Sequence, residues 1–403
     1  MLGPEFCTRP RGARSRGAAL TFVFATVLAT AAVTNCLPRD QERTRPPRPV
    51  TPPAASAADR PGRAVDREEL ARAATEAVAD GKSGAQAAEE VVSRSGDRWG
   101  AVYDRREYEE FEQALDGAYT GVGLSARRDA RGRVVVTRVH PGGPAGRAGI
   151  RPGDQLRAVD GRPVRGRSVS EVVALLRGDA EGGRAAGSPV VLGLQRSTRA
   201  WSETLRRARL ATEDVTVQRL DDDAVRAVRI RVAAFTKGTG ARVRAAVRDA
   251  PAGVGVLLDL RGNSGGLVTE AVAAASAFLD GGLVATYDVH GEEKALYAEP
   301  GGDTGRPLVA LVDGGTMSAA ELLAGALKDR GRAVTVGTRT FGKGSVQMPN
   351  RLPDGSVAEL TVGHYRTPAG HGVDGRGITP DVVVGDRAEE RARTVLSGLG
   401  GGS

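Results

Sequence analysis

Apolar runs of strand length alternate with segments of helical spacing through residues 201–384, and this alternation restricts the fold more than any other feature. Residues 254–260 form an apolar run typical of a buried strand, and apolar positions then recur at helical spacing from 267 to 279. Repeated strand–helix units predict an α/β core. The further elements expected are a strand at 308–312, a helix from about 318 to 330 and a strand at 333–336.

Residues 117–200 differ in texture, with short β runs and glycine-rich turns. Gly153-Asp154 and Asp160-Gly161 supply the turn residues that bracket a short strand. Together with the segments 119–124 and 139–145, these turns resemble a PDZ domain. We therefore expect an inserted PDZ-like β-rich domain, with strands near 134–136 and 190–194 and a helix near 170–176.

The PDZ resemblance also implies a binding site. PDZ domains bind the C-terminus of a peptide by adding it as a strand to a sheet edge, and backbone N–H groups take the carboxylate. By this resemblance the carboxylate cradle is the loop Gly121-Val122-Gly123-Leu124. The expected partners are therefore protein or peptide substrates with free C-termini.

A basic and apolar segment precedes these domains. Four arginines between Arg9 and Arg16 are followed by a mostly apolar run from Ala18 to Val33, which is the pattern of a secretory signal or a membrane anchor. The arginines are expected to stay inside while the rest of the chain is exported. The predicted location is therefore extracytoplasmic, either secreted or anchored through this segment to the outer face of the cytoplasmic membrane.

The distribution of charge, cysteine and histidine excludes several classes of function. The net charge is +8, but residues 1–63 hold ten arginines and four acidic residues and so carry +6 of it, which argues against a nucleic-acid partner for the folded part. Cys7 and Cys36 both lie in the same segment, so cysteine catalysis and disulfides are not expected in the folded part. The four histidines form no H-E-x-x-H pair, and we expect no metal and no cofactor.

Ser318 stands at the start of the helix expected at 318–330. Ser318 and Glu321 fit a capping box, in which the serine serves only to begin the helix. A serine at this position also has oriented backbone N–H groups and the positive end of the helix dipole beside it. Those groups suit a nucleophile whose reaction generates an oxyanion. The segment alone leaves both interpretations open, because a catalytic hydroxyl needs a base.

Lys343 is the candidate for that base. It is one of only five lysines and stands between Gly342 and Gly344, where the backbone can approach another segment closely. A lysine base must be neutral although its ordinary pKa is about 10.4, so it must be buried. Gln347 lies four residues further along an extended segment and so on the same strand face. Its uncharged amide is expected to orient the lysine amine.

Residues 258–266 run from a strand through glycines towards a helix. The backbone N–H groups of Gly265 and Gly266 are expected to form half of an oxyanion hole, and the N–H of Ala319 the other half. A G-x-S-x-G pattern in the same stretch makes Ser264 an alternative nucleophile, as in an α/β-hydrolase, with one of two histidines completing its triad, His364 or His371.

The stretches around Ser318, Lys343 and Gly266 together resemble the carboxyl-terminal processing (tail-specific) proteases, as does the stretch from Tyr365 to Val382. The similarity covers about residues 64–384, in the family's order of helices, PDZ domain and peptidase core. It implies a serine endopeptidase that cleaves exported proteins near their C-terminus through an acyl-enzyme, with Ser318 as nucleophile, Lys343 as general base and Gln347 as its orienting partner. One departure is Ser264, because this family usually has proline there.

Two further interpretations were weighed against the protease. Residues 337–343 nearly match a phosphate-binding P-loop, but Gly344 stands where that motif requires serine or threonine. A non-catalytic PDZ adaptor with an inactive protease-like core would have no reason to keep the serine, lysine and glutamine together. The predicted order is a signal peptide or membrane anchor at 1–36, a Pro/Arg-rich linker at 37–63, an N-terminal helical region at 64–116, a PDZ-like domain at 117–200, a Ser/Lys peptidase core at 201–384 and a tail at 385–403.

Overall fold

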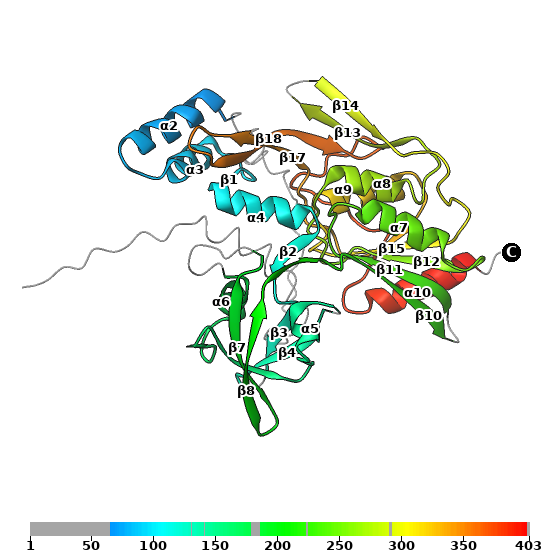
Figure 1. Ribbon diagram of the computed structural model, residues 1–403. Coiled ribbons are helices and arrows are strands. Elements are labelled where there is room, and N and C mark those ends of the chain that lie inside the picture. Colours follow the sequence, from blue (N-terminus) through cyan, green and yellow to red (C-terminus); the bar gives the residue numbers. More distant parts are fainter. Residues whose placement is uncertain are drawn as a thin grey trace, which may run out of the picture.

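A computed structural model describes residues 65–129, 131–140, 142–178, 186–222, 225–289 and 292–400. The predicted signal or anchor at 1–36 and the predicted linker at 37–63 lie outside these residues. Within the described ranges, no helix is long and apolar enough to cross a membrane. The described chain forms an α/β core, a helical region on one side of it and a PDZ-like domain that projects from it (Figure 1).

A six-stranded sheet forms the centre of the core, in the order β10-β11-β12-β15-β16-β19. β10 and β11 pair antiparallel, and every later pair is parallel. Every residue of β12 and β15 is buried, which explains why both strands stand out as apolar runs. The strands are β10 (Val215–Asp222), β11 (Val225–Val232), β12 (Gly255–Asp259), β15 (Leu308–Val312), β16 (Val334–Gly337) and β19 (Val382–Val383).

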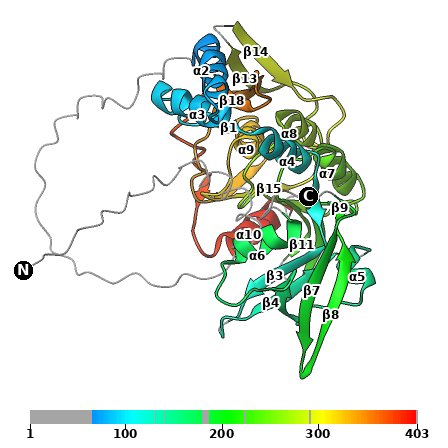
Figure 2. The same ribbon diagram turned by 60° about the vertical axis from the view of Figure 1, so that its left-hand side comes forward.

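Alternate side chains of these strands pack into two hydrophobic cores, one on each face of the sheet. Val256 and Leu258 of β12 pack with α7, α8 and α9, whereas Leu257 packs with α10. The two helical layers lie on opposite sides of the sheet in both views (Figure 2). The helices are α7 (Thr239–Arg248), α8 (Val268–Ala275), α9 (Ala319–Asp329) and α10 (Ala388–Gly400).

The last helix departs from the sequence analysis, which expected a tail at 385–403. Ala388, Ala392 and Leu396 of α10 are buried against the central sheet. Their spacing of four residues places them on one helix face. Two of the three are alanines, so the apolar stripe is narrow and was overlooked.

An ion network fastens α10 to the end of β12. Asp259 is fully buried and accepts two hydrogen bonds from the Arg261 guanidinium, each 2.8 Å long, and another from Arg229. Both arginines also pair with Glu389 of α10, at 3.0 Å and 3.2 Å. Burial alone raises the pKa of Asp259, but the two arginines outweigh burial and hold that pKa below its ordinary value. The carboxylate therefore stays ionised and ties α10 to the loop that begins at Arg261.

A second sheet carries the N-terminal helical region. Its path is β1-β18-β13-β14, and β17 pairs with β18. Leu70 of α2 and Val91 of α3 pack on Leu360 of β18, so the helical region expected at 64–116 is held against the core. The elements are α2 (Arg67–Ala79), α3 (Gly84–Ser95), β1 (Ala101–Tyr103), α4 (Arg105–Leu115), β13 (Leu283–Val289), β14 (Glu292–Tyr297), β17 (Ser345–Arg351) and β18 (Val357–Arg366).

The PDZ-like domain has a core of its own and joins the rest through one strand pair, β2 and β9. Its sheet has the order β3-β4-β5-β7-β8. The expected boundary at residue 200 falls inside the hairpin of β7 and β8, so this sheet extends to Arg206. The elements are β2 (Ala118–Gly121), β3 (Leu124–Arg128), β4 (Val134–Val139), α5 (Pro144–Arg147), β5 (Gln155–Val159), β6 (Arg162–Pro163), α6 (Val169–Arg177), β7 (Pro189–Arg196), β8 (Arg199–Arg206) and β9 (Ala208–Ala211).

Candidate active site

Three loops meet at the carboxyl edge of the central sheet, because each follows one of its parallel strands. Residues 260–266 follow β12, residues 313–318 follow β15 and residues 338–344 follow β16. The Met317 N–H donates to the Asn263 carbonyl oxygen at 2.8 Å, and the Phe341 N–H donates to the Thr316 carbonyl oxygen at 3.0 Å. The three segments singled out from the sequence are thus in direct contact.

Ser318 has a strained backbone at the start of α9. Its φ of 54° and ψ of −119° lie where L-residues other than glycine are rare. Such a conformation costs about 1–3 kcal/mol and clusters at functional sites. A serine on a tight turn from a strand into a helix is also the arrangement that exposes the nucleophile in other hydrolases. Since an ordinary N-cap residue has extended backbone angles, this conformation favours catalysis over simple capping.

The carboxylate of Glu321 joins the serine loop to the lysine loop. It is fully buried, and its Oε2 accepts the N–H groups of both Ser318 and Lys343, each at 2.9 Å. Its Oε1 accepts the Gly342 N–H at 2.7 Å and the Thr340 hydroxyl at 2.5 Å. Burial raises the pKa of Glu321 above its ordinary value, although the four hydrogen bonds act in the opposite direction.

The phenol of Tyr365 makes a second connection between the same two loops. Tyr365 is buried, and its hydroxyl lies 2.9 Å from the carbonyl oxygen of Ser318 and 3.2 Å from that of Lys343. Its single proton can be donated to either oxygen. Burial raises the pKa of Tyr365 well above its ordinary value, so the phenol keeps this proton. The backbones of Ser318 and Lys343 are thus connected through their N–H groups by Glu321 and through their carbonyl oxygens by Tyr365.

The amine of Lys343 has no hydrogen bond or ion pair with any residue that the structure describes. Burial lowers the pKa of Lys343 below its ordinary value, although the charges of Glu359, Asp97 and Asp374 act to raise it. The ring of Trp99 lies beside the amine, 5.4 Å from ring centroid to Nζ. A half-buried lysine without a carboxylate partner is suited to act as a neutral base.

The three residues predicted for the oxyanion hole differ in whether their backbone N–H groups are available. The Gly265 N–H already donates to the Asn263 side-chain oxygen at 2.9 Å. The N–H groups of Gly266 and Ala319 donate to no other group in the described ranges. Gly265 has a φ of +98°, and a Cβ on it would lie 2.9 Å from Ser318 Cβ, so glycine is needed where this loop meets the serine. Gly266 and Ala319 are therefore the better-placed donors.

The structure does not bring Gln347 to the lysine amine. The Gln347 amide nitrogen lies 2.7 Å from Ser345 Oγ and 3.5 Å from Thr361 Oγ1. The register of β17 against β18 shifts between Val346 and Gln347. The extra residue at this shift is Val362 of β18. Lys343 lies in the loop before β17, where strand alternation does not apply, and the orienting role of Gln347 stays a prediction.

Comparison with known proteins follows the same division of the chain. A model of peptidase family S41 matches residues 227–384, and a model of the PDZ domain matches residues 135–183. The chloroplastic C-terminal processing peptidase of Tetradesmus obliquus is 39% identical over 286 residues, which are 66% of this chain and 60% of that protein. The carboxy-terminal processing protease CtpA of Bacillus subtilis is 30% identical over 297 residues, 72% of this chain and 62% of that protein.

The chain belongs to peptidase family S41. The family and the PDZ domain predicted from the sequence are confirmed. A solved candidate S41 protease from Bacteroides fragilis shares the fold, with a TM-score of 0.51 at 17% identity over 75% of this chain and 87% of that one. The chain spans about three fifths of the length of the two relatives named above.

The PDZ domain of this S41 peptidase has an open sheet edge next to the predicted cradle. β3 is the edge strand, and α6 packs across β3 and β5. Gly123 has a φ of +77° and turns the chain between β2 and β3. The N–H groups of Val122 and Gly123 donate to nothing else among the described residues. They fit the predicted carboxylate cradle, which stays a prediction.

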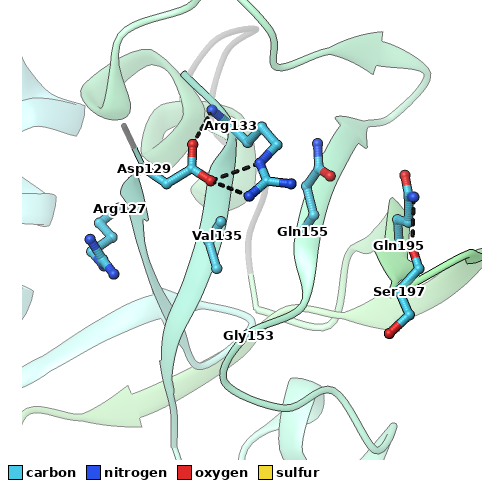
Figure 3. Close-up of a pocket in the computed structure, with 8 residues that line it drawn as sticks. All are labelled: Arg127, Asp129, Arg133, Val135, Gly153, Gln155, Gln195 and Ser197. Carbon is cyan, nitrogen blue, oxygen red and sulfur yellow. Dashed lines mark hydrogen bonds and ion pairs between the residues drawn. The ribbon is translucent and has the colours of Figure 1, made fainter. Parts of the chain in front are cut away.

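A pocket of about 340 Å³ also lies on the PDZ domain (Figure 3). Its lining includes Arg127, Gln155 and Gln195, whose neighbours along the strands face the domain core. The pocket is therefore on the outer face of the sheet, and Asp129 and Arg133 pair with each other at its rim. α6 packs on the core face of this sheet, so the pocket lies on the face opposite α6, and none of its lining residues belongs to the loops around Ser318.

The structure does not support the two alternative sites, the α/β-hydrolase nucleophile at Ser264 and the phosphate-binding P-loop at 337–343. Ser264 has no strained backbone, and neither His364 nor His371 contacts it within the residues described. The two histidines instead approach Asp374 and Asp329, at 3.7 Å and 3.9 Å. The loop at 338–344 runs into the strand β17 rather than into a helix, whereas a P-loop needs a helix there.

Three residues at the candidate site carry no pattern in the sequence that connects them with it: Glu321, Tyr365 and Trp99. Glu321 was noticed only as a capping residue, because the local pattern explained it. Tyr365 and Trp99 reach the site from distant segments, and no spacing in the sequence connects them with Ser318 or Lys343. An aromatic residue in a chain with only 4% aromatics was the one available signal.

We expect Glu321→Gln to lower kcat for peptide hydrolysis at least tenfold with little change in KM. A carboxamide offers one acceptor oxygen in place of two, so two of the four hydrogen bonds are lost, and each hydrogen bond to a charged group is worth about 1.5–3 kcal/mol. Thr340→Ser, which keeps the hydroxyl that donates to Glu321, is the matched control. Steady-state kinetics of both variants test this expectation, and a wild-type kcat in Glu321→Gln would contradict it.

Proposed function

We propose that this protein is a serine endopeptidase that cleaves exported proteins near their C-terminus, with Ser318 as nucleophile and Lys343 as general base. The observation that carries the proposal is the shared acceptor of these two residues. Both backbone N–H groups lie 2.9 Å from the same Glu321 oxygen. This contact accompanies a strained serine at a helix start and a half-buried lysine without a carboxylate partner.

The reaction follows from these positions. The neutral Lys343 amine takes the proton of the Ser318 hydroxyl as Oγ attacks the peptide carbonyl carbon. The carbonyl oxygen becomes an oxyanion that accepts hydrogen bonds from the N–H groups of Gly266 and Ala319. The Lys343 ammonium then returns its proton to the leaving amine, and the C–N bond breaks. Water hydrolyses the resulting ester by the same steps, with Lys343 again as base.

The PDZ domain supports selection by the substrate tail. A peptide added to β3 would run beside α6 and end at the loop 121–124. Its carboxylate would accept from the N–H groups of Val122 and Gly123, and buried Val122 supplies an apolar contact. Tails that end in small or apolar residues should be favoured, because burying an unpaired charge is costly. Free C-termini of proteins and peptides are thus the proposed partners.

The N-terminal segment supports a location outside the cytoplasm, and the PDZ domain leaves one rival function to be tested. The basic and apolar pattern of residues 1–36 supports export and either release or attachment to the membrane. A non-catalytic PDZ adaptor would bind the same tails but would leave them intact. Cleavage of a tailed protein by the purified protein separates the two functions directly.

Ser318→Ala should abolish peptide hydrolysis and leave the fold intact, because it removes only the nucleophilic oxygen. Activity of the purified variant on a tailed substrate, with thermal unfolding as a check of the fold, provides the measurement. Ser264→Ala is the matched control and should stay active. More than a few per cent of residual activity in Ser318→Ala would refute the assigned nucleophile, and loss in Ser264→Ala alone would favour the hydrolase alternative.

Lys343→Arg should be as inactive as Lys343→Ala, because a guanidinium is not deprotonated in proteins. In the wild-type protein, the rate should rise with pH as Lys343 loses its proton. Since burial lowers the pKa of Lys343, this rise should come below the ordinary range of lysine, whose pKa is about 10.4. The pH dependence of kcat/KM measures it. An active arginine variant would contradict the mechanism.

Amidation of the last residue of a substrate should slow cleavage well upstream of it, because it removes the charge that the loop 121–124 is proposed to bind. The test is a matched pair of peptides, free acid and amide, cleaved by the wild-type protein. Equal rates would mean that the tail is not recognised by its carboxylate, and only a Ser/Lys endopeptidase would remain.

A further inference from the structure

Trp99 reaches Lys343 from the N-terminal helical region, although 244 positions separate them in the sequence. It lies between α3 and β1, and its ring centroid is 5.4 Å from Lys343 Nζ. The indole N–H donates to Asp374 Oδ1 at 3.2 Å. The same oxygen accepts the N–H of Gly344 at 3.1 Å. One carboxylate oxygen thus connects the indole with the residue next to the lysine.

The backbone of Trp99 is fixed by Asp97. The Asp97 carboxylate accepts the N–H groups of Trp99 and Gly100, at 3.1 Å and 2.9 Å. It also accepts the N–H and the hydroxyl of Thr361 in β18, both at 2.8 Å. The segment that carries Trp99 is therefore attached to the strand that pairs with the lysine loop. Phe341 lies against the indole, with 5.8 Å between ring centroids.

We infer that Trp99 is a positioning residue for the catalytic base: its indole covers the Lys343 amine and excludes water from it. The inference rests on the proposed Ser318/Lys343 dyad and extends it to the N-terminal region. The hydrogen bond to Asp374 and the contact with Phe341 hold the indole in this place beside the amine. The base is then complete only when residues 65–100 are packed on β18.

The charged groups around the amine come from several elements. Three carboxylates lie near it: Glu359 of β18, Asp97 before Trp99, and Asp374 after β18. His364 approaches Asp374, and Glu321 binds the Lys343 backbone. The Arg98 guanidinium lies 4.6 Å from the Trp99 ring centroid. The three carboxylates near the amine all favour the ammonium form. Exclusion of water favours the neutral amine. For Lys343 to be neutral, the exclusion of water by the Trp99 ring must outweigh the effect of the three carboxylates.

The indole has two opposed effects on the amine. The face of an aromatic ring attracts a cation, which favours the ammonium form. Exclusion of water by the same ring favours the neutral amine. The direction in which Lys343 titrates after removal of the ring therefore distinguishes a cover from a cation-binding face.

The experiment is a pH titration of Lys343 by NMR in the purified protein labelled with ¹³C-lysine. Only five lysines contribute signals. The signal that is lost in Lys343→Arg is assigned to Lys343. In Trp99→Ala we expect the titration midpoint to rise by about one pH unit, which is a tenfold change in the ionisation equilibrium. The kcat at neutral pH should fall about tenfold and recover at high pH, with KM unchanged.

Two variants complete the test. Trp99→Phe keeps an aromatic ring but loses the bond to Asp374, so a smaller rise is expected, and it decides the question if Trp99→Ala does not fold. Trp201→Phe, at the second tryptophan of the chain, is the matched control and should change neither quantity. A midpoint that stays constant or falls in Trp99→Phe and Trp99→Ala overturns the inference, as does a lower kcat with an unshifted pH profile.

The inference and the proposed dyad fail in different ways. Wild-type activity in Lys343→Arg would refute the dyad, and the role of Trp99 as a positioning residue would fall with it. An inactive Lys343→Arg together with an unshifted Lys343 midpoint in the Trp99 variants would refute the role of Trp99 alone.

Discussion

The buried carboxylate of Glu321 is the interaction on which the active-site geometry depends. An ionised group inside a protein is costly unless hydrogen bonds compensate for the lost water. All four donors to Glu321 come from two loops, one ending at Ser318 and the other at residues 340–343. The charge is therefore compensated only when these loops lie together. One side chain thus couples the strained serine of α9 to the position of the lysine, and the loops cannot separate without exposing an unpaired charge.

The sequence predicts the parts of this arrangement that are local. The buried strands and the helices that follow them come from patterns of a few residues, and Ser318 and Lys343 stand out by helix position and glycine context. The contacts that assemble the site are long-range. Trp99, Tyr365 and Glu321 act through hydrogen bonds to loops far along the chain, so periodicity contains no trace of them. The placement of Gln347 depends on strand alternation, but Lys343 lies in the loop before β17, outside the strand to which that alternation applies.

The PDZ domain is connected to the same loops by backbone hydrogen bonds. Residues 233–237 lie between the strand pair β2–β9 and the glycine loop at 260–266. The Lys237 N–H donates to the carbonyl oxygen of Leu115, the last residue of α4 before β2, at 2.9 Å. The Phe235 N–H donates to the carbonyl oxygen of Gly265 at 2.8 Å. The Leu267 N–H returns to the Phe235 carbonyl oxygen at 2.7 Å. A rotation of the PDZ domain about its two connecting strands would therefore pull on the segment next to the proposed oxyanion donors. The proposed tail site and the proposed oxyanion donors are thus linked through a short series of backbone hydrogen bonds.

Three acidic residues lie near the amine of Lys343, the proposed base, without an ion pair to it among the described residues. An ion pair with Asp97, Asp374 or Glu359 would favour the ammonium form and so remove the base. Each carboxylate is instead occupied by neutral donors: Asp97 by backbone N–H groups and the Thr361 hydroxyl, Asp374 by the Gly344 N–H and the indole, and Glu359 by the Tyr108 phenol. Burial also raises the pKa of Glu359 above its ordinary value, which weakens its charge as a partner. Asp97 and Asp374 fix backbone segments around the lysine, and no carboxylate forms an ion pair with its amine within the described ranges.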